Sequence, residues 1–131
     1  MSDRDDLLSM LQESRNELSS AIQGLPDDKL TVPLAGDWSA KDFMGHITAW
    51  DEFTVSDLRR IARGRLPCLA AFREAEVDNW NAFLIRPRKL FPLPQIRAEF
   101  EEARAEMVAA LKDLPEGLLA QARWCATSSL S

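Results

Sequence analysis

The chain contains a single histidine, His46, in the segment 36–52, GDWSAKDFMGHITAWDE. An imidazole is a common ligand of divalent metals and a common general base near neutral pH. A catalytic zinc-type site needs about three protein ligands, so one imidazole alone cannot hold a metal tightly. Because His46 lies beside the apolar face of its expected helix, it also fits a neutral, hydrogen-bonded core histidine. The sequence leaves both roles open for His46.

Carboxylates near His46 are the groups that would have to complete a metal site. Aspartate and glutamate oxygens coordinate metals well, and the candidates are Asp42, Asp51, Glu52, Glu76 and Asp78. Asp42 lies one helical turn before His46, a spacing that fits a carboxylate orienting the imidazole. The same residue lies three positions after Ser39, the spacing of a capping box. We favour the cap, and we expect the helix to begin near Ala40.

Aromatic and amide side chains in the same part of the sequence could form a ligand pocket. Trp38, Trp50 and Trp80 combine broad apolar surfaces with an indole N–H, which suits pocket walls. Such residues are more often core, since burying one contributes roughly 1.5–3 kcal/mol. Asn81 either contacts a substrate or holds its helix to the loop before the helix that carries His46.

Four amphipathic helices are predicted to position these residues. Apolar side chains recur at helical spacing from about Asp3 to Ile22, from Ala40 to a break at Gly64 and Pro67, from Ala70 to Arg86, and from Gln95 to Leu114. The expected inward face of the third helix comprises Val77, Trp80, Phe83 and Leu84. We expect 25–38 to be a long connection without a strand, and 116–131 to add one or two helical turns before a frayed tail. The prediction is one domain, 1–131, with an all-α fold: an antiparallel four-helix bundle.

Composition narrows the function classes. The chain has 131 residues, 46% hydrophobic and 28% charged, with a net charge of -5, which argues against nucleic-acid binding. Two basic clusters, 59–65 and 86–89, flank expected helix ends, where cations complement the helix dipole. The N-terminus has no secretory signal pattern, and no stretch is long enough to span a membrane. With only two cysteines, a disulfide framework is implausible, so we expect a protein of the reducing cytoplasm.

Two blocks carry a resemblance to a known family. Trp38-Ser39-Ala40-Lys41-Asp42, continuing to His46, Trp50 and Glu52, resembles the DinB/YfiT-like superfamily, particularly its ClbS/DfsB-type branch. The block 75–83, AEVDNWNAF, is similar to that branch's third-helix signature. The resemblance implies a four-helix bundle, often dimeric, with a shallow pocket at one end of the core. Many members hold a divalent metal there, such as zinc or nickel.

The metal site that the resemblance implies is incomplete in this chain. The usual ligands are a histidine matched by His46 and a His-x-x-x-His pair on a later helix, and this pair has no counterpart here. The chain ends about where that later helix would lie, as expected for a C-terminally shortened or frame-altered member. The usual three-histidine set therefore cannot form within one chain.

Two functions are compatible with these observations. The first is a stress or detoxification protein that processes or sequesters a reactive small molecule. His46 would then be the general base or metal ligand, Trp38 and Trp50 the pocket walls, and Asp78 and Asn81 the polar contacts. The second is a non-catalytic binding or assembly module that forms a homodimer, which the missing ligands favour, because a bundle without the later helix would expose apolar core surface. The sequence does not decide whether the protein is an enzyme.

Overall fold

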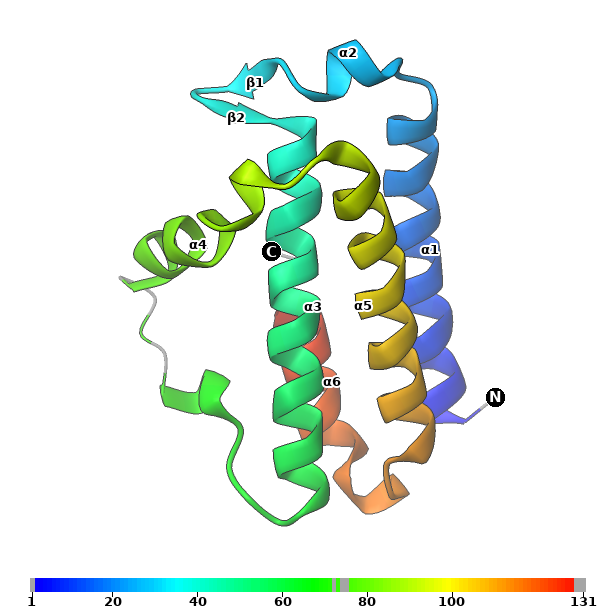
Figure 1. Ribbon diagram of the computed structural model, residues 1–131. Coiled ribbons are helices and arrows are strands. Elements are labelled where there is room, and N and C mark those ends of the chain that lie inside the picture. The colour runs from blue at the N-terminus through cyan, green and yellow to red at the C-terminus, as the bar shows by residue number, and fades with distance from the viewer. Residues whose placement is uncertain (1, 72, 74–75, 129–131) are drawn as a thin grey trace.

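Three long helices, α1, α3 and α5, form the body of the molecule in a computed structural model that describes residues 2–71, 73 and 76–128 (Figure 1). The α-helices are α1 (Asp3–Gln23), α2 (Asp27–Leu30), α3 (Ala40–Ala62), α4 (Val77–Ile85), α5 (Leu93–Asp113) and α6 (Leu119–Ser128). Short 3-10 turns are η1 (Cys68–Ala71), η3 (Arg88–Leu90) and η4 (Glu116–Leu118). The predicted all-helical character is confirmed for the body of the fold. None of the described helices is long and apolar enough to cross a membrane.

The start of α3 is fixed by a capping box. The Ser39 hydroxyl accepts a hydrogen bond from the Asp42 backbone N–H at 3.1 Å, and the Asp42 carboxylate accepts one from the Ser39 backbone N–H at 3.0 Å. Such caps satisfy first-turn N–H groups and stabilise a helix by about 1 kcal/mol. The predicted helix start at Ala40 is confirmed, and Asp42 has the capping role that we favoured.

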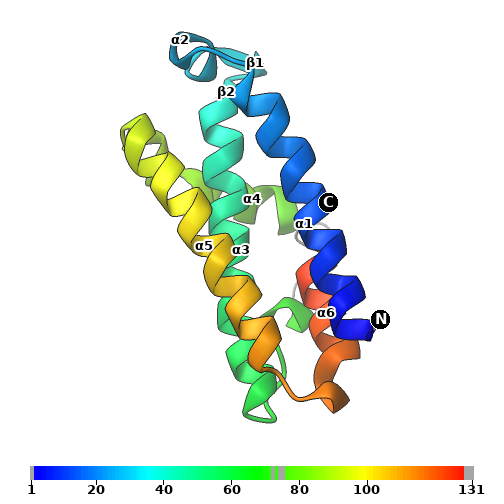
Figure 2. The ribbon, with the colours of Figure 1, turned by 90° about the vertical axis from the view of Figure 1, so that its right-hand side faces the viewer.

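Two core clusters show how the long helices run. One joins the N-terminal halves of α3 and α5 through Met44, Ile96 and Phe100. The other joins their C-terminal halves and includes Leu58 of α3 and Leu111 of α5. The two helices therefore run side by side in the same direction, and α1 runs opposite to both (Figure 1; Figure 2). The expectation of a wholly antiparallel arrangement is wrong, because the segment 63–92 returns the chain to the end at which α3 began.

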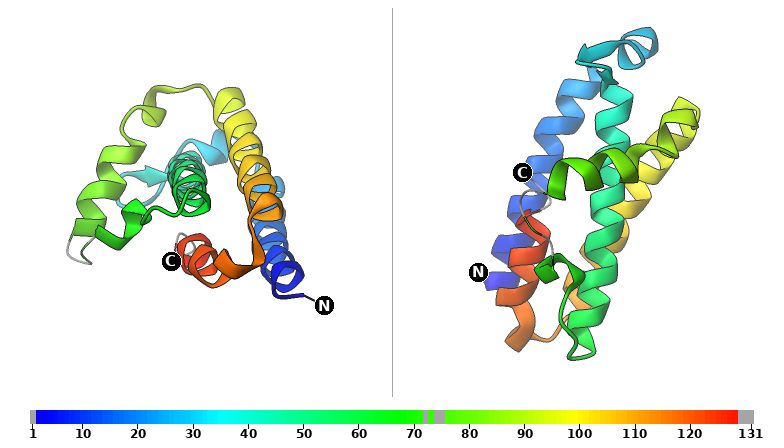
Figure 3. Two further views of the ribbon diagram at one scale, coloured as in Figure 1. Left: turned by 90° about the horizontal axis from the view of Figure 1, so that it is seen from below. Right: turned by 90° about the vertical axis from the view of Figure 1, so that its left-hand side faces the viewer.

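The third predicted helix differs most from the structure. Residues 77–85 are helical, residues 68–71 form a 3-10 turn, and 72, 74 and 75 lie outside the described residues. This short helix, α4, flanks α3 on the side away from α1 and α5 (Figure 1; Figure 3). Its expected inward face is largely open to solvent, since Trp80 is 37% and Phe83 61% exposed. Only Ile85 of α4 is buried.

The helix that completes the core is α6, in the segment predicted to add only one or two turns. It spans Leu119–Ser128, and Ala122, Cys125 and Ala126 are fully buried against α1, α3 and α5. The small side chains of α6 let it approach the other helices closely. The same small side chains make its apolar face hard to recognise in the sequence. The end of the predicted frayed tail, 129–131, lies outside the described residues.

A short hairpin precedes α3, where no strand was predicted. Strand β1 (Pro33–Ala35) pairs antiparallel with β2 (Trp38–Ser39), with Pro33 opposite Ser39 and Ala35 opposite Trp38. Gly36 occupies the turn with φ of 61°, a left-handed conformation that glycine adopts at little cost. Strands of three and two residues are too short to produce a readable alternation. The hairpin places Trp38 over the first turns of α3.

Candidate functional site

His46 lies in the second turn of α3, beneath the hairpin. Its ring packs edge-on against Trp38, with the ring centroids 5.4 Å apart, and Trp38 also meets Phe43 at 5.1 Å. The imidazole is half-buried, and its Nδ1 is buried without a hydrogen-bond partner among the described residues. Burial lowers the pKa of His46 below its ordinary value of 6.5. The imidazole is therefore neutral at pH 7.

The carboxylate one turn before His46 is already engaged. Asp42 accepts the Ser39 backbone N–H in the cap, and its Oδ2 lies 3.5 Å from Nζ of Lys89. Lys41 donates to the Lys89 backbone carbonyl at 3.2 Å, so the same turn of α3 also holds the segment after α4. Through these contacts Asp42 stabilises the fold, and it does not orient the imidazole of His46.

Asp51 is the centre of a buried ion network. It is 1% exposed and accepts hydrogen bonds from Arg15 at 3.0 Å and from Arg104 at 3.1 Å to each oxygen. Arg15 also lies 3.8 Å above the Phe100 ring, and burial followed by repulsion from Arg104 lowers the pKa of the Arg15 guanidinium. The network joins α1, α3 and α5. Its carboxylate has no free oxygen to offer a metal.

The remaining candidate ligands are also dispersed. Glu52 pairs with Arg88 at 2.6 Å, Glu76 lies 4.0 Å from Arg73, and Asp78 is exposed on the first turn of α4. Burial, followed by the charge of Asp57, raises the pKa of the Cys125 thiol to about 12, so it is protonated at pH 7. Across 2–71, 73 and 76–128, no three His, Cys, Asp or Glu side chains come together to hold a metal ion. The donor set around His46 does not fit a divalent metal.

Trp50, predicted as a pocket wall, and Asn81, predicted as a polar contact, join α4 to α3. The Trp50 indole N–H donates to the Asn81 side-chain oxygen at 2.6 Å. Gly45 permits α4 to approach α3 closely, because a Cβ at position 45 would lie 2.6 Å from Cδ1 of Ile85 and 3.3 Å from Cβ of Arg88. Of the two roles considered for Asn81, neither includes this contact: it holds α4 to α3 itself, not to the loop before α3. Trp50 is 7% exposed and belongs to the core.

Two adjoining hollows lie along α4, and we call them together the α4 face. The aromatic hollow, about 330 Å³, is lined by Glu76, Asn79, Trp80 and Phe83. The basic hollow, also about 330 Å³, is lined by Asn79, Ala82, Phe83, Arg86 and Lys89. The rings of Trp80 and Phe83 meet edge-on, with centroids 5.7 Å apart and planes at 87°. Asn79 and Phe83 line both hollows, so one ligand could occupy the two.

Of the residues singled out in the sequence, Glu76 and Trp80 line the aromatic hollow. The others lie around the α4 face rather than within it: Trp38, His46, Trp50, Asp78 and Asn81. Lys89 connects the basic hollow to the surroundings of His46, since its Nζ lies 5.8 Å from the centroid of the Trp38 ring that covers His46. Asp78 precedes Asn79 on α4 but lines neither hollow. Sequence reasoning missed Phe83, Arg86 and Lys89. The available signal is the basic cluster 86–89 directly after an aromatic helix, whose charges the sequence analysis attributes to the helix dipole.

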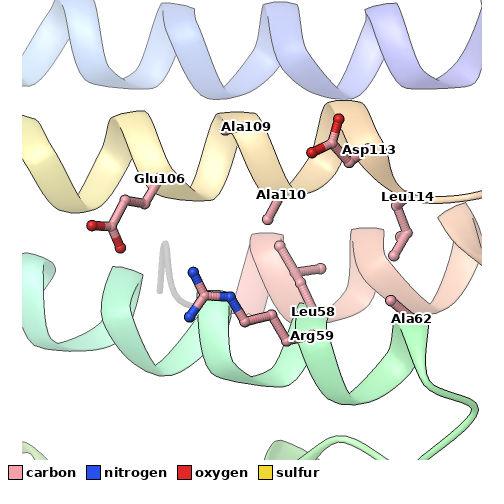
Figure 4. Close-up of a pocket in the computed structure, with 8 residues that line it drawn as sticks. All are labelled: Leu58, Arg59, Ala62, Glu106, Ala109, Ala110, Asp113 and Leu114. Carbon is pink, nitrogen blue, oxygen red and sulfur yellow. The ribbon is translucent and has the colours of Figure 1, made fainter.

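A third hollow, about 290 Å³, lies between α3 and α5 (Figure 4). Leu58 and Ala110 point toward one another across it, Arg59 extends from α3, and Glu106 and Asp113 extend from α5. We call it the α3–α5 groove. None of the predicted site residues lines it.

Comparison with known proteins places almost the whole chain in one family. Residues 10–127 match the sequence model of the DinB superfamily. No curated protein and no solved structure matches the chain.

Proposed function

Because the chain belongs to the DinB superfamily, we propose that it is a stress or detoxification protein of the ClbS/DfsB type that sequesters a reactive small molecule on the α4 face. The blocks 38–52 and 75–83 support this branch, and Ala75 is the one residue of these blocks outside the described ranges. In this proposal the core of α1, α3, α5 and α6 is the family's four-helix bundle. The unpaired thiols of Cys68 and Cys125 favour the reducing cytoplasm as its location.

The exposed aromatic pair of α4 carries the proposal. Burying a large apolar side chain contributes roughly 1.5–3 kcal/mol, yet Trp80 and Phe83 remain 37% and 61% exposed beside a hollow. Meanwhile Asn81, Ile85 and Arg88 fasten the opposite side of α4 and the following turn to α3. A small helix held in place by one side and presenting aromatic rings on the other is suited to binding an apolar ligand.

Sequestration is favoured over metal-dependent turnover. The three carboxylates nearest His46 along α3 already have partners: Asp42 in the helix cap, Asp51 with two arginines and Glu52 with Arg88. In the proposal, His46 and Trp38 form the apolar border of the α4 face, next to Lys89. A neutral imidazole suits this border because it brings no charge to an apolar ligand.

The proposal is tested with N-phenyl-1-naphthylamine, an uncharged probe that fluoresces in apolar surroundings. We expect saturable binding, weakened about tenfold or more in Phe83→Ala, because the substitution removes a ring of this hydrophobic surface. Leu66→Ala is the matched control, since Leu66 is 73% exposed in the loop that follows α3. It should bind the probe like the wild type. Equal binding by the Phe83→Ala variant would refute the α4 face as the site.

The second candidate is a non-catalytic assembly module that forms a homodimer, and the α3–α5 groove favours it. Ala62, Ala109 and Ala110 line the groove, and their small side chains allow another chain to approach closely. Arg59 stands on one wall, and Glu106 and Asp113 stand on the other. A twofold axis through the groove would bring Arg59 of each subunit to a carboxylate of the other, so the surface is complementary to itself.

A further inference from the structure

The two hollows of the α4 face differ in chemical character. The aromatic hollow offers the faces and edges of Trp80 and Phe83, which suit a flat apolar body. The basic hollow offers the guanidinium of Arg86 and the ammonium of Lys89. Because Asn79 and Phe83 line both, the two environments are continuous. Because the two hollows follow one another along α4, the α4 face has an apolar end and a cationic end.

The cationic end keeps uncompensated charge. Arg86 is exposed, and no carboxylate pairs with it among the residues that the structure describes. Within the described part of the chain, Lys89 has one carboxylate neighbour, Asp42 at 3.5 Å, and that carboxylate is shared with the helix cap. Arg88, by contrast, is neutralised by Glu52 and Glu99 at 2.6 and 3.0 Å. Arg86 and Lys89 are therefore the cations available to a ligand.

Two acidic residues at the start of α4 set the orientation of a charged ligand. Glu76 lines the aromatic hollow before the first turn of α4, and Asp78 is exposed on that turn. An anionic group would be repelled at that end and attracted at the other. Asn79 and Arg86 are seven positions apart, which corresponds to about 10 Å along a helix. This length matches a body of two or three fused or linked rings.

We infer that the α4 face takes an amphipathic organic anion: a flat apolar body in the aromatic hollow with one carboxylate, sulfonate or phosphate group at Arg86 and Lys89. This inference rests on the proposed function and adds the ligand's chemical class. The ring of Phe83, shared by the two hollows and three positions before Arg86, is placed to contact the junction between body and anionic group. The cations select among apolar ligands, because they favour those that carry an anion at one end.

A pair of probes isolates the charge of the ligand. 1-Anilinonaphthalene-8-sulfonate has the ring system of N-phenyl-1-naphthylamine and one added sulfonate. We expect Arg86→Gln to weaken the sulfonate probe about threefold to fivefold, the upper part of the range for an exposed ion pair, and to leave the neutral probe unchanged. Arg65→Gln removes the same charge in the loop after α3 and should change neither. Raising NaCl should weaken only the sulfonate probe.

Each outcome decides a separate claim. If Phe83→Ala weakens both probes but Arg86→Gln weakens neither, or both equally, the anionic ligand class is wrong and the proposed function stands. If Phe83→Ala leaves the neutral probe unchanged, or no saturable binding is seen, the proposed function fails and the inference fails with it. Near-ultraviolet circular dichroism of every variant must match the wild type, so that probe binding reports the folded surface.

Discussion

Substituting Asp51→Asn should unfold the protein at much lower denaturant concentration while leaving the shape of the side chain almost unchanged. Asp51 is 1% exposed, and its partners Arg15 and Arg104 are 6% and 8% exposed. The amide keeps one acceptor oxygen but removes the negative charge and places an N–H₂ group against two guanidinium groups. Two buried cations then lack a counter-charge.

The size of the effect follows from the contacts. Three charge-assisted hydrogen bonds of 3.0, 3.1 and 3.1 Å converge on the Asp51 carboxylate. Removing one partner from a buried ion pair costs about 3–5 kcal/mol, against a total stability of about 5–15 kcal/mol for a typical domain. With a urea dependence of about 2 kcal/mol per molar, the unfolding midpoint should fall by roughly 1.5–2.5 M.

Equilibrium urea unfolding followed by circular dichroism measures this change. The matched control replaces the whole network with apolar side chains, in the triple variant Arg15→Met, Asp51→Leu and Arg104→Met. Such replacements are often neutral or stabilising, so this variant should recover most of the loss. A midpoint for Asp51→Asn within about 0.5 M of the wild type, roughly 1 kcal/mol, would refute the assignment of Asp51 to the fold.

Three further predictions concern titration, assembly and thiol chemistry. The lowered pKa of His46 means that the unfolded state binds the proton first as pH falls below 6.5, so stability should fall from pH 7 to 5.5, and less steeply in His46→Gln. Arg59→Glu should dissociate a homodimer in sedimentation velocity, and adding Glu106→Arg should restore it. Ellman's reagent should react quickly with the exposed Cys68, and with Cys125 only after unfolding, because burial keeps the Cys125 thiol protonated.

Each of these measurements has a contrary result. Identical pH dependence of the unfolding free energy in wild type and His46→Gln would show that the imidazole titrates normally in the folded chain. A wild type that sediments as a monomer at high concentration would refute the proposed homodimer. Rapid reaction of two thiols in the native protein would contradict the buried position of Cys125 against Asp57.

Local signals in the sequence proved reliable where the interaction itself is local. The Ser39 and Asp42 capping box predicted both the start of α3 and the role of Asp42, because cap hydrogen bonds join residues three positions apart. The apolar stripes of α1, α3 and α5 likewise predicted three long helices. Their relative direction was predicted wrongly, since it depends on the path that the chain takes between α3 and α5.

The candidate site was predicted only in part, because apolar spacing does not say which face of a helix is covered. Trp80 and Phe83 have the spacing of a core stripe, yet they face outward, and α6 fills the core with alanine and Cys125 instead. The contact of Trp38 with His46 arises from a hairpin too short to be recognised in the sequence. Asn81 was singled out, but its partner Trp50 is 31 positions away and only folding brings them together.

The most direct test of the α4 face is a titration of ¹⁵N-labelled protein with 1-anilinonaphthalene-8-sulfonate, followed through the indole N–H signals of its four tryptophans. Trp80→Phe assigns the signal of the residue that lines the aromatic hollow. We predict that the Trp80 signal shifts with saturation while the signal of Trp124, on α6, stays in place. A stationary Trp80 signal, with or without movement of Trp124, would contradict ligand binding on the α4 face.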